Sequence, residues 1–175
     1  MVGEHPPVGI WVWYADRQTE DGHYLADSLA ALKEECGVDR LYIKAGDGPY
    51  EWEQFGRMVD PIHRAGMEAW SWQYVYGNTL DEMYPAINAY ILGADGHVLD
   101  AETEFKGHDP TALITEIRDR APGLPLWYSS FAFPRWHTTF PWNEFHTLCD
   151  GAMPQVFPGY GGPWNASTPG TVALY

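Results

Sequence analysis

Apolar residues follow two alternating spacings along the chain, and these predict strands and helices in turn. Nearly continuous apolar runs indicate buried strands, whereas apolar residues that recur every three or four positions indicate one face of a helix. The predicted strands lie near Ile10–Tyr14, Leu41–Lys44, Glu68–Tyr74, Val98–Ala101, Leu126–Ser129 and Ala152–Val156. The predicted helices cover Tyr24–Cys36, Trp52–Ala65, Leu80–Leu92 and Pro110–Arg120, followed by a short turn at Trp142–Leu148 and the start of a further helix at Thr168–Tyr175.

This alternation predicts the fold class. The β/α units recur at roughly 25–30 residues, the length of a βαβ unit. Regular alternation predicts an α/β fold with a parallel sheet covered by helices, either a doubly wound sheet or a (β/α)8 barrel. A barrel needs eight units, so we expect an incomplete (β/α)8 TIM-type barrel with about six parallel strands in sequential order. Residues 1–175 are expected to form one domain, and truncation at the C-terminus is one explanation for the missing units.

An open barrel has two exposed sheet edges. Their N–H and C=O groups need partners, because burying them without hydrogen bonds is costly. We therefore expect the open side to be covered by a second copy of the chain, by a partner chain, by a rearranged tail or by a missing continuation of the chain.

The net charge and the absence of certain motifs argue against several classes of function. The chain has 10 Lys and Arg against 24 Asp and Glu, a net charge of −14, which argues against nucleic acid and anionic membrane surfaces as partners. Neither a Gly-rich phosphate loop nor a metal-binding His motif occurs, so we expect no cofactor and no metal. The N-terminus has no signal-peptide pattern, which predicts synthesis in the cytoplasm, with phage-linked or non-classical release as routes outward. Aromatic residues make up 15% of the chain, a composition that suits sugar stacking as well as core packing.

Two carboxylates on the fourth predicted strand are the candidate catalytic residues. Asp100 and Glu102 are two positions apart, so both side chains lie on one face at the C-terminal end, where barrel active sites occur. Two such close carboxylates cannot ionise independently, so one pKa should rise and make that group a candidate general acid. We expect Lys44 to pair with Asp100 and keep it ionised, which leaves the proton on Glu102. The structural alternative is that Asp100 caps a neighbour and Glu102 is solvated.

Aromatic and polar side chains near other strand ends are candidates for binding substrate. Trp70, Trp72, Tyr74 and Tyr76 share one strand face, and this face either packs under helices or lines a saccharide groove. A glutamine inside the last predicted strand can hydrogen-bond either a sugar or a catalytic carboxylate. The expected substrate-binding residues are Lys44, Asp16, Trp13, Trp72, Tyr74, Tyr128 and Gln155.

The order of motifs resembles that of glycoside hydrolase family 25, the lysozyme-type muramidases of bacteria and phages. The segments LYIKAGDG, AGMEAWSWQYVYG, VLDAE, LPLWYSS and MPQVF carry the resemblance, which runs from about Gly9 to Phe157. MPQVF also resembles glycosidase-like barrel domains of actinobacteria and their phages. The resemblance implies an incomplete or irregular β/α barrel that cleaves the glycan of peptidoglycan without a cofactor. It also implies that Glu102 is the general acid and Asp100 its companion carboxylate.

The chain departs from that family pattern in two places. The family has a Gly-x-Asp on its first strand, whereas Gly9-Ile10 is followed here by Trp11, and Asp16 is the candidate substitute. A carboxylate on a late strand of the family would lie beyond Tyr175. Two functions are therefore open: a glycoside hydrolase acting on a polysaccharide such as peptidoglycan, or a catalytically silent barrel. The silent barrel would bind sugar or hold structure in a phage or surface assembly.

Overall fold

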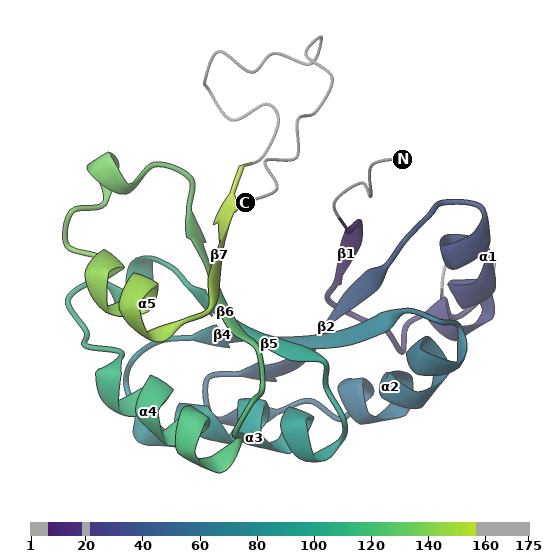
Figure 1. The fold of residues 1–175 in the computed structure, drawn as a ribbon, viewed down its shortest axis with the longest axis horizontal. Coiled ribbons are helices and arrows are strands. Elements are labelled where there is room, and N and C mark those ends of the chain that lie inside the picture. Colours follow the sequence, from purple (N-terminus) through teal and green to yellow (C-terminus); the bar gives the residue numbers. More distant parts are fainter. Residues whose placement is uncertain (1–6, 19–21, 157–175) are drawn as a thin grey trace, which may run out of the picture.

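A parallel sheet curved into an open half-barrel forms the centre of the molecule. The computed structural model describes residues 7–18 and 22–156, so the expected helix at Thr168–Tyr175 lies outside the described residues. Six parallel strands are neighbours in the order in which they occur in the chain, which confirms the predicted incomplete TIM-type barrel (Figure 1). They are β1 (Gly9–Val12), β2 (Arg40–Asp47), β4 (Glu68–Val75), β5 (Gly96–Ala101), β6 (Leu126–Phe131) and β7 (Gly151–Gln155).

Helices cover the convex face of the sheet and leave the concave face open (Figure 1). Short 3-10 turns at Leu25–Ser28, Leu80–Met83, Thr103–Phe105 and Pro134–Trp136 accompany the helices. Pro85 does not kink its helix, because it lies in the first turn, where its missing N–H leaves no intrahelical bond unmade. The helices are α1 (Leu29–Glu34), α2 (Gln54–Arg64), α3 (Tyr84–Ile91), α4 (Thr111–Arg120) and α5 (Trp142–Leu148).

One strand was not expected. β3 (Tyr50–Glu51) runs antiparallel to the end of β2, and the turn between them contains Gly48 with a φ of 55°. Glycine adopts such a φ without the steric penalty that a Cβ would impose. A two-residue strand is too short to give a hydrophobic period, so the sequence pattern could not predict it.

Two apolar clusters join the sheet to the helices. In the first, Ile43 of β2 packs with Phe55 and Ile62 of α2. In the second, Leu99 of β5 packs with helix residues that include Ile117 of α4. Every second residue of these strands therefore faces the helices, and the residues between them face the concave side.

Aromatic rings fill the base of the concave face. Trp70, Trp72 and Tyr42 are buried there together with Val98, so the aromatic positions of the third predicted strand face inward, away from the helices. The Trp70 and Trp127 rings each lie against a glycine of the neighbouring strand. An added Cβ would stand 2.4 Å from the Trp70 ring at Gly96 and 2.8 Å from the Trp127 ring at Gly151. These glycines thus make room for the inner aromatic layer.

The contact between Gly96 and Trp70 gives a first prediction. Gly96→Ala should lower the free energy of unfolding by about 1–3 kcal/mol, the usual cost of overpacking, because a whole indole must move. Urea denaturation measures the change. Adding Trp70→Phe to the same chain should restore part of the stability, since the smaller ring leaves room for the new methyl group. Equal stability of Gly96→Ala and the parent protein would contradict the close approach.

The two edge strands of the sheet, β1 and β7, differ in composition. β7 contains Pro154, and proline within a sheet is confined to edge strands because it donates no ladder hydrogen bond. β1 exposes Ile10, which is 36% accessible, and Trp13 directly after the strand is 50% accessible. Among the described residues, none of the helices combines the length and the apolar character needed to cross a membrane.

Candidate active site

Three polar side chains from two strands converge at the C-terminal end of the sheet. The side chain of Asp100 faces inward near the C-terminal end of β5. Glu102 follows that strand directly, and Gln155 is the last residue of β7. The Gln155 Nε2 donates hydrogen bonds to Asp100 Oδ1 at 2.8 Å and to Glu102 Oε1 at 2.9 Å. Ser129 of β6 lies opposite Asp100 in the strand register, and its hydroxyl accepts a hydrogen bond of 3.3 Å from the same amide. A small residue there lets the glutamine reach across β6.

Burial sets the charge state of this pair. Asp100 is only 6% exposed, and desolvation, followed by the nearby charge of Glu102, raises the pKa of Asp100 to about 7. The hydrogen bonds from Gln155 and Ser129 oppose the rise without cancelling it. Glu102 is half-buried and closer to solvent. Asp100 is therefore the carboxyl that holds a proton near neutral pH, whereas the sequence led us to expect that proton on Glu102.

Contrary to the expectation from the sequence, Lys44 does not pair with Asp100. Its Nζ lies 2.6 Å from Asp47 Oδ2, and the lysine is 1% exposed. The register between β2 and β4 shifts between Lys44 and Gly46, which places Asp47 opposite the inward-facing Tyr74. This β-bulge turns Asp47 toward the same face as Lys44, so the lysine finds a carboxylate on its own strand. A one-residue bulge leaves no mark in the hydrophobic pattern, which is why Asp47 was missed.

A cage of tryptophans surrounds the Lys44 ammonium group. Its Nζ lies 4.1 Å from the centre of the Trp13 ring, 4.5 Å from that of Trp52 and 5.1 Å from that of Trp72. Cation–π attraction of this kind stabilises a buried ammonium group. Trp72 is fully buried and supports Trp13 edge-on at 4.9 Å, so Trp72 cannot contact a substrate directly. Trp13 is half exposed and remains available to a ligand.

Two tyrosines connect the lysine to the carboxylates. Tyr76 donates a hydrogen bond to Asp47 at 2.7 Å, which raises the pKa of Tyr76 to about 12. Tyr74 donates a hydrogen bond to Glu104. Burial, and then this hydrogen bond, raise the pKa of Tyr74 well above its usual value. The two rings meet edge-to-face at 5.0 Å. A continuous polar and aromatic rim thus runs from the end of β2 to the segment after β5.

Two expected site residues lie elsewhere. Tyr128 faces the helices, where its ring packs 4.9 Å from Phe145 of α5, so it is not part of the concave surface. Its strand has aromatic residues at successive positions, and the sequence pattern could not say which of them faces inward. Asp16 pairs with Arg57 of α2 at 2.9 Å, in a cavity beside β1 that shares no lining residue with the carboxylate pair. In the part of the chain that the structure describes, no three His, Cys, Asp or Glu side chains are grouped as a metal site would require.

Comparison with known proteins supports the fold. No protein-family model and no curated protein sequence matches the chain. A family 25 glycosyl hydrolase from Bacillus anthracis is similar in structure with a TM-score of 0.58 and 13% identity, over 86% of this chain and 71% of that protein. The bacterial lysozyme from Streptomyces coelicolor has a TM-score of 0.56 and 16% identity, over 83% of this chain and 73% of its own.

A different enzyme class is similar to the same degree. The carboxyl transferase domain of Rhizobium etli pyruvate carboxylase has a TM-score of 0.58 and 12% identity, and the match covers 83% of this chain but only 26% of that one. At such low identities the likeness shows the fold alone, a β/α barrel of the kind found in glycosidases and in other enzymes. Function has to be argued from the side chains of the site.

Proposed function

We propose that the protein is a glycoside hydrolase that acts on a polysaccharide, with bacterial cell-wall peptidoglycan as its substrate. The observation that carries the proposal is the Asp100–Glu102 pair, held by Gln155 at the C-terminal end of the sheet. Glycosidases need two carboxyl groups in different protonation states, and these two differ in burial. The fold, which glycosidases share, and the resemblance of the motifs to those of family 25 support the proposal.

The environments of the two carboxyl groups suggest their roles. Asp100 holds a proton up to about pH 7 and donates it to the glycosidic oxygen as the bond to the anomeric carbon breaks. Glu102 stabilises the positive charge that develops on the sugar. A water molecule then adds to the anomeric carbon, and Asp100 takes back a proton from it. This order reverses the roles that the family resemblance implies for the two residues.

The spacing of the pair suggests a stereochemical outcome. Both accepting oxygens bond the same Gln155 nitrogen, so they lie within about 6 Å of each other. Retaining glycosidases have carboxyl groups about 5–5.5 Å apart, whereas inverting enzymes need about 6.5–9.5 Å to hold a water molecule between them. We therefore propose retention of the anomeric configuration.

Clearing of a cell-wall suspension tests the proposed activity. Wild-type protein should lower the turbidity of purified peptidoglycan, and Glu102→Gln should not, because the amide keeps the shape of the carboxylate but not its charge. Glu34→Gln is the matched control, since Glu34 is an exposed carboxylate near the end of α1. Clearing by Glu102→Gln at the rate of Glu34→Gln would remove Glu102 from the mechanism.

We also propose that a second copy of the chain or a partner chain covers the β1 edge. The exposed Ile10 and Val8 side chains support this proposal. Light scattering should report a mass above that of one chain, and Ile10→Lys should lower it, because a charged side chain blocks edge pairing. A wild-type monomer would show that this edge is stable in water.

A further inference from the structure

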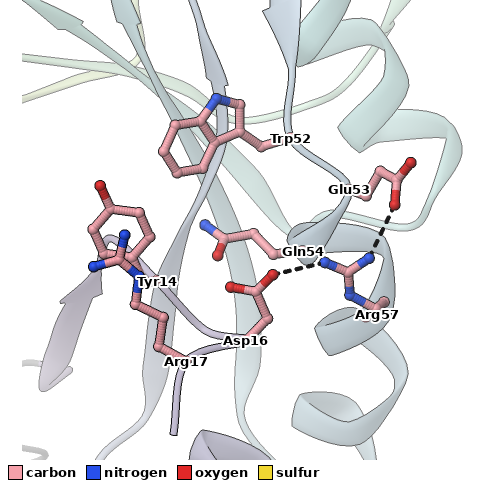
Figure 2. Close-up of a pocket in the computed structure, with 7 residues that line it drawn as sticks. All are labelled: Tyr14, Asp16, Arg17, Trp52, Glu53, Gln54 and Arg57. Atoms are coloured by element: carbon pink, nitrogen blue, oxygen red, sulfur yellow. Dashed lines mark hydrogen bonds and ion pairs between the residues drawn. The ribbon is translucent and has the colours of Figure 1, made fainter.

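A cavity opens between the C-terminal end of β1 and the start of α2, away from the carboxylate pair (Figure 2). Its volume is about 540 Å³, within the range of small-molecule sites. Tyr14 and Trp52 form one part of the wall, with ring centres 5.7 Å apart. Asp16, Arg17 and Arg57 supply charged groups. Aromatic faces beside charged, planar groups are the chemistry that sugar rings and their substituents bind.

Contacts of Gln54 and Arg57 connect the walls of this cavity. Gln54, which is 3% exposed, accepts a hydrogen bond from the Ala15 amide at 2.9 Å and donates to the Trp13 carbonyl at 2.8 Å. It thereby ties the segment after β1 to the start of α2. Arg57 bridges Asp16 at 2.9 Å and Glu53 at 3.0 Å, as the dashed lines in Figure 2 show. A preformed wall lowers the entropic cost of binding.

Arg17 differs from Arg57 in its contacts. Its guanidinium group lies 3.3 Å from the centre of the Tyr14 ring, which holds the group in place. Within residues 7–18 and 22–156, no salt bridge to Arg17 is formed, because both carboxylates of the cavity wall bond Arg57. A guanidinium group stacked in this way keeps its N–H edge available for two parallel hydrogen bonds to a carboxylate.

One wall residue of the cavity also contacts the Lys44 ammonium group of the concave face. The Trp52 ring contacts Tyr14 within the cavity and the Lys44 ammonium group at 4.5 Å. β1 lies three strands away from β5, which corresponds to roughly 15 Å across the sheet. A glycan chain bound at Asp100 and Glu102 would have to extend over several sugar units to reach Arg17.

We propose that this cavity is a second glycan subsite that takes a sugar carrying a carboxylate, with Tyr14 and Trp52 against the sugar ring and Arg17 on the carboxylate. The inference rests on the proposed function for the class of ligand, a glycan. It adds a requirement for an acidic sugar at a distance from the catalytic pair.

Calorimetric titration of the Asp100→Asn protein, which binds without turnover, tests this subsite. The acidic probe is a tetrasaccharide of alternating N-acetylglucosamine and N-acetylmuramic acid, and the neutral probe is the N-acetylglucosamine tetramer. Arg17→Gln should weaken binding of the acidic probe about tenfold, through loss of a charged hydrogen bond, and leave the neutral probe unchanged. Arg64→Gln is the matched control, because Arg64 is exposed at the far end of α2. Tyr14→Ala should weaken both probes.

The outcomes separate this inference from the proposed activity. If wild-type protein cleaves no glycan but Arg17→Gln selectively loses the acidic probe, the subsite stands and the protein is a binding module. If wild-type protein is active but Arg17→Gln binds the acidic probe as well as Arg64→Gln does, the subsite is refuted and the activity stands. Absence of binding of either probe to every variant would also refute the subsite.

Discussion

Replacing Asp100 with Asn is expected to lower the rate of glycan hydrolysis about 100- to 10,000-fold, the usual contribution of general acid catalysis. In the wild-type protein, activity should fall as pH rises through about 7, because burial raises the pKa of Asp100 to about 7 and the proton is lost there. Asn cannot ionise, so the residual activity of Asp100→Asn should show no descending limb near that pH. Rates measured from pH 4 to 9 on soluble glycan strands give both quantities.

The same substitution has a second consequence that does not depend on activity. In the unfolded chain the Asp100 carboxyl has an ordinary pKa near 4. Between about pH 4 and 7 the Asp100 carboxyl therefore binds more proton in the folded protein than in the unfolded chain, and its contribution to the free energy of unfolding falls as pH rises. Asp100→Asn should lose less stability over this interval than the wild-type protein. Parallel curves for the two proteins would contradict the raised pKa.

Replacing Trp72 with Ala is expected to lower the free energy of unfolding by about 3–5 kcal/mol, the range measured for large aromatic residues removed from cores. Trp72 is fully buried, its ring packs 5.0 Å from Trp11, and its Nε1 donates to the Val12 carbonyl at 3.1 Å. The substitution removes the side-chain packing between β4 and β1 across the concave face and leaves a cavity there. Denaturant unfolding followed by far-UV circular dichroism measures the loss.

Trp136 provides the matched control for Trp72. It is 64% exposed in the turn that follows β6, so Trp136→Ala removes the same side chain from a site with little burial. Its effect on stability should stay within about 0.5 kcal/mol, as for most surface substitutions. Equal losses for the two variants would mean that the inner aromatic layer does not stabilise the sheet.

The sequence pattern predicted the strands and their order well, because each strand is a compact apolar run with a helix on either side. It predicted that Asp100, Glu102 and Gln155 lie at strand ends, and the spacing of two placed both carboxylates on one face. It could not assign strand faces where aromatic residues are adjacent, so Tyr128 was placed in the groove although it packs on α5. Both faces of this sheet are buried at that point, and a pattern of burial alone does not distinguish them.

The hydrophobic pattern also could not predict which charged side chains pair with one another. The bulge in β2 pairs Lys44 with Asp47 instead of the expected Asp100. The raised pKa of Asp100 follows mainly from its burial, which the hydrophobic pattern did not predict. The cavity beside β1 depends on Gln54, whose side chain joins segments about 40 positions apart in the chain. Such long-range contacts carry no local signature in the sequence.

The release of new reducing ends from purified peptidoglycan tests the central claim most directly. We predict that the wild-type protein produces reducing sugars at pH 6, whereas Glu102→Gln and Asp100→Asn, each folded as judged by circular dichroism, release almost none. The result that would contradict the account is a wild-type protein that binds the glycan but forms no reducing ends, which would identify a catalytically silent sugar-binding barrel.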